Sequence, residues 1–217
     1  MSLLTPQLLA DDPRLETAMT NAGFFQSGSD QPGAWLSSDG IPVDLMVPER
    51  LAGPGARAAR IPPHSKRATR RARGLEAALV DFDTLKVEAL DRNDHRTAKV
   101  KVAGAAALLV AKLHKIGERV DTPSRLNDKD AHDAYRLLRA TETGDLSRAF
   151  VRLLADPLSE EATRESLVYL GELFATGPEA LGAMMAGRAE EAVGDPAQVS
   201  IAVSLLAGDL LGALKLV

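Results

Sequence analysis

The spacing of hydrophobic residues along the chain changes near residue 103. Before that point, short runs alternate apolar and polar residues and are separated by Gly and Pro, which is typical of strands joined by turns. We expect strands at residues 35–36, 41–47, 84–90 and 97–102, and a helix at residues 15–23. Strands followed by helices indicate an α+β chain.

After residue 103, apolar residues recur every three to four positions, and Asp, Pro and Gly stand where helices should start and stop. We therefore divide the chain into a mixed α/β region, residues 1–102, and a helical bundle domain, residues 103–217. The expected helices are residues 103–119, 129–140, 146–155, 160–175, 178–193 and 196–216.

Composition narrows the possible classes of protein. The chain has 217 residues and no cysteine, which excludes a disulfide framework, a thiolate zinc site and a cysteine nucleophile. Its first residues lack the basic segment of a signal peptide, and its longest apolar run is shorter than the ~20 residues of a membrane span. We expect a cytoplasmic protein with no membrane partner.

Charge is unevenly distributed. Seven cations and no acid lie between Arg57 and Arg73, although the whole chain has a net charge of −4. A stretch of this kind is suited to phosphate groups, which Arg and Lys bind without regard to sequence. Arg67, Arg70 and Arg71 are its candidate phosphate ligands. The alternative is a solvated basic surface that balances the acidic helices.

Two charged residues occupy positions where the helical pattern calls for apolar ones. Lys112 falls inside the apolar stripe of residues 103–119, with Lys115 and Arg119 along one edge, and Asp130 shares a face with apolar residues of the next helix. An isolated buried charge is costly, so Lys112 and Asp130 must pair with each other or meet a ligand. The first alternative is a brace between two helices, and the second is a site for a nucleotide phosphate.

Asp44 is the third unusual charge. It lies within an apolar strand that the pattern predicts to be buried on both sides. A carboxylate in such a strand is structural when alone and catalytic when others join it around a metal. Asp81 and Asp83 have the spacing of two carboxylates on one side of a strand, but we interpret them as a turn and a helix cap.

These features resemble a known family. Residues 108–115 read LLVAKLHK, Arg119 follows, and residues 129–138 read KDAHDAYRLL. Together they are similar to the signature of the AbiEii/AbiGii nucleotidyltransferase toxins, in particular the MenT toxins of MenAT toxin–antitoxin modules. Upstream, residues 40–48 read GIPVDLMVP and resemble a strand of that family's catalytic sheet.

The resemblance implies a polymerase-β-like nucleotidyltransferase core followed by a helical domain. Such an enzyme transfers a nucleoside monophosphate from an NTP to the 3′ end of tRNA, which blocks translation, and carboxylates hold the Mg²⁺ that neutralises the phosphoryl group. The implied partners are NTP, tRNA and a cognate antitoxin protein.

The resemblance also implies roles for individual residues. Lys112 would grip the triphosphate, Asp130 would belong to the active-site set, and Asp44 would be a catalytic carboxylate and tentative metal ligand. The remaining residues of the signature have less defined roles in binding substrate or phosphate: Lys115, Arg119, Lys129 and Asp133.

One part of the family pattern is missing from this sequence. The family's main metal motif is Gly-Ser followed by Asp-x-Asp/Glu on a strand, and we expect the nucleotidyltransferase sheet to be incomplete at its N-terminal end. Three explanations stay open: a truncation, a start codon upstream of Met1, or an unusual arrangement of the carboxylates present. A second copy of the chain would then cover the exposed sheet. The alternative function is a degenerate, non-catalytic protein of this fold that binds NTP, RNA or an antitoxin.

Overall fold

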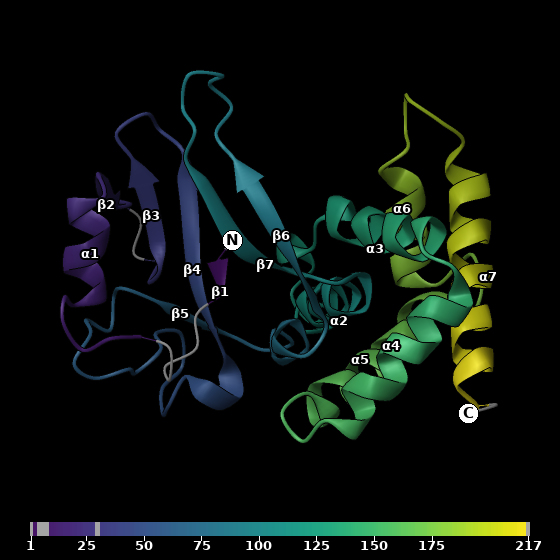
Figure 1. Ribbon diagram of the computed structural model, residues 1–217. Helices are drawn as coiled ribbons and strands as arrows, with labels where there is room; N and C mark the ends of the chain where they lie inside the picture. Colours follow the sequence, from purple (N-terminus) through teal and green to yellow (C-terminus); the bar gives the residue numbers. More distant parts are fainter. Residues whose placement is uncertain (1, 4–8, 29–30, 216–217) are drawn as a thin grey trace. The chain divides into compact units, whose positions relative to one another are not determined.

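The computed structural model describes residues 2–3, 9–28 and 31–215 and divides into two compact units, Met1–Glu76 and Ala77–Val217 (Figure 1). The first unit is mostly strand and loop and the second is mostly helix, so the expected α+β class is confirmed. The division lies at residue 76, whereas the sequence pattern places it at residue 102.

The first unit is built around one mixed sheet. Its central strand β4, Pro42–Pro48, runs antiparallel to β3 and parallel to β1 and β5, and β2 pairs with β3 on the far side. The strand expected at residues 41–47 is thereby confirmed. The other elements of this unit are β1 (Ser2–Leu3), α1 (Leu15–Asn21), β2 (Phe24–Gln26), β3 (Ala34–Ser37), the short helix η2 (Glu49–Leu51), β5 (Arg70–Ala72) and the short helix η3 (Glu76–Leu79), which crosses the boundary.

The core of this unit packs around Trp35, which is 3% exposed. Its indole Nε1–H donates to the carbonyl of Ala68 at 2.9 Å, so the one polar atom of the ring is satisfied inside the core. Gly33 directly precedes β3, the strand that contains Trp35, and has a φ of +76°. A Cβ at this position would lie 2.3 Å from the carbonyl oxygen of Leu45. Only glycine fits this close approach of two backbones.

The second unit begins with a two-stranded antiparallel ribbon, β6 (Phe82–Glu88) and β7 (Thr97–Ala103). Its base is tied to the helices: Asp81 Oδ2 accepts the N–H of Ala107 at 3.1 Å, near the start of α2. Asp81 therefore acts as a cap, although of a helix distant in the sequence, and the expected turn is wrong for Asp83, which lies within β6. Ala77 is buried in the helical core and Ala103 packs against it, which explains why the ribbon groups with the helices and not with the sheet.

The helices follow the predicted order, with two differences at their ends. The segment expected as a helix at 178–193 is helical only in α6, because residues beyond Arg188 form turns that include Ala192 at φ +71°. The helix at 160–175 ends in a widened π-helical turn, and the predicted end at Leu216 lies outside the described residues. The helices are α2 (Ala105–Gly117), η4 (Pro123–Arg125), α3 (Asp128–Ala140), α4 (Thr143–Ala155), α5 (Glu160–Leu170), η5 (Gly171–Ala175), α6 (Leu181–Arg188) and α7 (Pro196–Lys215).

Helix α2 lies at the centre of this unit, with Leu109, Leu113 and Ile116 fully buried among α3, α4 and α5. His114 lies on the same buried face, where its Nε2 is 2.8 Å from the carbonyl oxygen of Ala162. Within the described residues, α7 is the one helix that is long and apolar enough to cross a membrane. That criterion of length and composition is also met by core helices, and α7 packs against α4 and α6.

Candidate functional site

Helix α2 presents three cations along one face. Lys112, Lys115 and Arg119 are spaced three and four residues apart, so the first two lie on neighbouring turns of α2 and Arg119 lies just past its end. Helix α3 packs against this face and presents Asp130 and Asp133, one turn apart, toward the cations. The two helices therefore meet through a group of opposite charges.

Asp130 is the deepest member of the group, with a side chain only 6% exposed. Its Oδ1 accepts hydrogen bonds from Lys112 Nζ at 3.1 Å and from Lys115 Nζ at 2.7 Å, and its Oδ2 lies 3.7 Å from Arg119 Nη1. Arg119 is fixed further by a hydrogen bond to the carbonyl of Arg125 at 3.2 Å. Lys112 and Asp130 thus pair with each other, which is the first of the two alternatives, a brace between helices, in a group larger than a single pair.

Asp133 lies nearer the surface and shares Lys112 with Asp130. Its Oδ2 accepts from Lys112 Nζ at 2.7 Å and lies 3.8 Å from Lys129 Nζ, one turn earlier on α3. The Asp133 side chain is 22% exposed and that of Lys129 is 78% exposed. Lys112 thus holds a carboxylate on each of two adjacent turns of α3.

The charges of this group shift one another's pKa values. Burial by itself would raise the pKa of Asp130, but hydrogen bonds from Lys115 and Lys112 outweigh burial and keep the pKa below its ordinary value. The pKa of Asp133 is lowered in the same way, against burial, by Lys112 and by the charges of Lys129 and Arg136. Burial would lower the pKa of Lys112, yet its two carboxylate partners raise it. All these groups are therefore charged near neutral pH.

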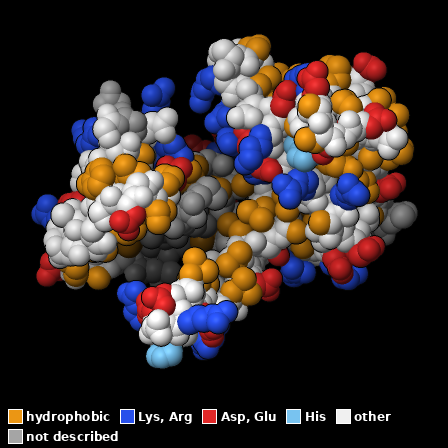
Figure 2. All heavy atoms as spheres, turned by 90° about the horizontal axis from the view of Figure 1, so that it is seen from above, with side chains coloured by type: hydrophobic (Ala, Val, Ile, Leu, Met, Phe, Trp, Pro, Cys, Tyr) orange, Lys and Arg blue, Asp and Glu red, His pale blue; other side chains and the backbone are white. Residues whose placement is uncertain are grey.

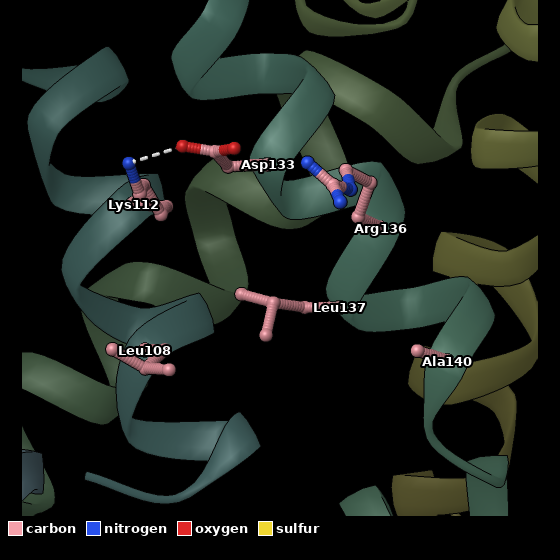
Figure 3. Close-up of a pocket in the computed structure, with 6 residues that line it drawn as sticks. All are labelled: Leu108, Lys112, Asp133, Arg136, Leu137 and Ala140. Carbon is pink, nitrogen blue, oxygen red and sulfur yellow. Dashed lines mark hydrogen bonds and ion pairs between the residues drawn. The ribbon is translucent and has the colours of Figure 1, made fainter. Parts of the chain in front are cut away.

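An open pocket of about 380 Å³ adjoins Lys112 and Asp133 (Figure 3). Lys112, Asp133 and Arg136 lie on one side of it, and apolar side chains lie on the other. These apolar residues are Leu108, Leu137 and Ala140. The surface that lines the pocket is almost wholly apolar, so Lys112, Asp133 and Arg136 contribute to it mainly through their carbon atoms.

The surroundings of the pocket carry more positive than negative charge. Lys112 and Arg136 line it together with Asp133, and three further cations contact Asp130 or Asp133, which gives five cations against two carboxylates in this charge group. On the face of the helical unit that Figure 2 shows, Lys and Arg side chains gather beside hydrophobic ones. An anion with an apolar body fits a pocket of this composition, because the excess cations neutralise it and the apolar wall shields it from water. The five cations are Lys112, Lys115, Arg119, Lys129 and Arg136.

Asp44 belongs to the first unit, whereas Lys112 belongs to the second. Its side chain is 46% exposed, and its Oδ2 lies 3.8 Å from Arg70 Nη2. The expectation that its strand is buried on both sides is wrong for this half of β4, because full burial begins at Leu45. Asp44 therefore stands at the shallow end of the strand, beside a cation.

The predicted phosphate-binding arginines bind groups of their own unit. Arg71 donates to the carbonyls of Gly53 and Gly55, and its Nη2 lies 3.1 Å from Glu49 Oε1. Arg70 donates to Gln31 Oε1 at 3.1 Å, and Arg67 to Gln26 Oε1 at 3.2 Å. Their binding of phosphate stays a prediction, and the contacts show that they also hold the loops around β5 in place.

The carboxylates do not form a site that fits Mg²⁺. Asp44 faces Arg70, while Asp130 and Asp133 are held by lysines that a divalent cation would have to displace. In the parts of the chain that the structure describes, no three His, Asp or Glu side chains are grouped as metal ligands. We therefore derive no reaction step through a metal from these residues.

Sequence reasoning missed the pocket residues Leu108, Arg136 and Leu137. A signal for them exists in retrospect: Leu108 precedes Lys112 by one turn, and Arg136 and Leu137 follow Asp133 by one turn. The fact that these rows of α2 and α3 face each other across an open space is visible only in the structure (Figure 3).

Comparison with known proteins adds no relative. No protein-family model matches the chain, and neither a curated protein nor a solved structure matches it significantly.

Proposed function

We propose that this chain binds the phosphate groups of a nucleotide at the α2–α3 cations and acts as a nucleotidyltransferase toxin of a toxin–antitoxin module. The reaction proposed is transfer of a nucleoside monophosphate from an NTP to the 3′ end of tRNA. The 3′-hydroxyl attacks the α-phosphorus, pyrophosphate leaves, and the blocked tRNA cannot be aminoacylated. The activity itself rests on the resemblance of residues 108–119 and 129–138 to that family.

One observation supports the nucleotide-binding part of the proposal. Lys112 lies at the wall of an open pocket, with Arg136 beside it and further cations behind. Ammonium and guanidinium groups are the usual protein ligands of phosphate, and several together neutralise a polyphosphate better than one. In this proposal Lys112 and Arg136 contact the phosphates, while Asp130 fixes the position of Lys112 from behind.

The alternative is a non-catalytic protein that binds NTP, RNA or an antitoxin through the same surface. It needs only binding at these cations and no transfer step. Binding and transfer therefore have to be measured separately.

The test uses the full chain, tRNA and NTP labelled in the α-phosphate, with and without Mg²⁺. If the chain is a transferase, the wild type labels tRNA and Lys112→Ala does not. Lys99→Ala, a matched control on the exposed strand β7, should label tRNA as the wild type does. Lys112→Ala leaves Asp130 with Lys115 and Arg119, so the fold should persist, and circular dichroism checks this.

Three outcomes separate the candidates. Mg²⁺-dependent labelling that requires Lys112 supports the transferase. Binding of NTP that requires Lys112, without labelling, supports the non-catalytic alternative. Absence of both binding and labelling refutes the proposal.

A further inference from the structure

The two carboxylates that share Lys112 are placed very differently. Asp130 is almost fully buried, contacts three cations of the α2 segment and does not line the pocket. Asp133 is less buried, contacts Lys112 at 2.7 Å and is the one acid among the residues that line the pocket. The first carboxylate braces two helices, whereas the second faces the place where a phosphate would meet Lys112 (Figure 3).

Asp133 also has a second cation within reach. Its Oδ2, which contacts Lys112, lies 3.8 Å from the Nζ of Lys129, whose long side chain is mostly exposed. A change of side-chain rotamer is enough to bring these two groups of the same helix into full contact, since residues four apart are neighbours on a helix surface. Asp133 can therefore leave Lys112 without losing a positive partner.

We propose that Asp133 is a gate on the anion site: its carboxylate and the bound phosphate compete for Lys112, and Lys129 receives Asp133 when the phosphate wins. This inference rests on the proposed binding of nucleotide phosphate at Lys112. It concerns the regulation of that site, and the reaction that follows plays no part in it.

The gate sets a minimum charge for the ligand. An anion with a single negative charge only replaces the charge of Asp133 at Lys112, so its binding is weak. A polyphosphate brings additional charges that Arg136, which lines the same pocket, can neutralise, so it displaces Asp133. Nucleoside triphosphates and tripolyphosphate are therefore admitted, whereas acetate and chloride are excluded.

Removing the competing charge should strengthen binding. We expect Asp133→Asn to bind tripolyphosphate and ATP about tenfold more tightly than the wild type at low salt, because the negative charge that competes for Lys112 is removed. The measurement is isothermal titration calorimetry on the full chain. Asp128→Asn is the matched control: it removes the same charge from the same helix, but Asp128 pairs with Arg188 at 2.7 Å, away from Lys112.

Lys129 distinguishes a gate from simple attraction. If Lys129 receives Asp133, Lys129→Ala weakens binding in the wild type and has no effect in the Asp133→Asn background. If Lys129 only contacts the phosphate, the loss is the same in both backgrounds. The double-mutant cycle measures this coupling directly.

The outcomes keep the gate and the proposed function apart. The gate is refuted if Asp133→Asn binds no more tightly than the wild type, or if Asp128→Asn tightens binding as much as Asp133→Asn does. In either case the proposed function still holds, provided that wild-type binding requires Lys112. Equal loss from Lys129→Ala in both backgrounds also overturns the gate. If neither the wild type nor Asp133→Asn binds tripolyphosphate or ATP, the gate and the proposed function both fall.

Discussion

Asp130→Asn tests whether the α2–α3 charge group stabilises the fold. The substitution keeps the shape of the side chain and removes its charge, which leaves three cations facing a neutral amide. Removing one partner of a fully buried ion pair costs about 3–5 kcal/mol. Here the side chains of Lys112 and Arg119 are each 25% exposed and can turn toward water, so we expect a smaller loss, about 2 kcal/mol.

Asp133→Asn is the internal control for this experiment. Asp133 also holds Lys112, but it is closer to solvent, and Lys112 keeps Asp130 when Asp133 is neutralised. The expected loss is about 0.5 kcal/mol. The two substitutions make the same chemical change one turn apart, so the difference between them reports the deeper burial of Asp130 together with its third cation partner.

The chain offers separate optical reports for its two units. Trp35 is the single tryptophan and lies in the core of the first unit, so its fluorescence reports that unit. Far-ultraviolet circular dichroism reports mainly α2 to α7 of the second unit. In urea, Asp130→Asn should lower the midpoint of the circular dichroism transition by about 1 M, for an m-value of about 2 kcal/mol per M.

Two results would refute this reasoning. A loss for Asp130→Asn no greater than that for Asp133→Asn would show that burial of the carboxylate does not matter. An equal shift of the Trp35 fluorescence transition would show that the effect is not confined to the helical unit.

Three further predictions use the same two probes. Because the pKa of Asp130 is lower in the folded than in the unfolded chain, its stabilisation is complete above about pH 4 and is lost as the pH falls through the folded-state value; Asp130→Asn should therefore lose less stability in acid than the wild type. Gly33→Ala should destabilise the first unit by more than about 2 kcal/mol, since its Cβ meets the Leu45 carbonyl, and an unchanged Trp35 fluorescence transition would contradict this. Asp81→Ala should cost about 1 kcal/mol in the circular dichroism transition by removing the cap of α2, and a change below the error of the measurement would show that the cap contributes nothing.

Periodicity predicted four of the described strands, most of the helices and part of the site, but not β1, β2 or β5. The apolar spacing gave α2 and α3 to within two residues at each end, and the charged residues inside that spacing predicted the contact between Lys112 and Asp130. The reason is physical: a charge in an apolar stripe is tolerated only with a partner, and the next helix supplies one.

The remaining features depend on contacts between residues that are distant in the sequence, and the sequence pattern did not predict them. Nothing near Arg71 in the sequence shows that the carbonyls of Gly53 and Gly55 accept from it, since those contacts depend on how the loops close. The burial of β4 was overestimated at Asp44 because an apolar run does not show where along its length the covering elements begin. The compact units divide at residue 76 because residues at the ends of β6 and β7 join the helical core, which alternation along the chain does not indicate.

Strands β6 and β7 pair with each other and with no other described strand, and the side chains of this ribbon are exposed on both faces. Leu85 and Val87 on one strand and Val100 on the other face solvent. Two strands without a third strand or a covering helix are barely stable in water. Their amide protons should therefore exchange with solvent long before those of α2, and proteases should cut first between the two strands. The ribbon is thus the part of the second unit that opens without the rest unfolding, and only its base, held by Asp81 at α2, should share the stability of the helices.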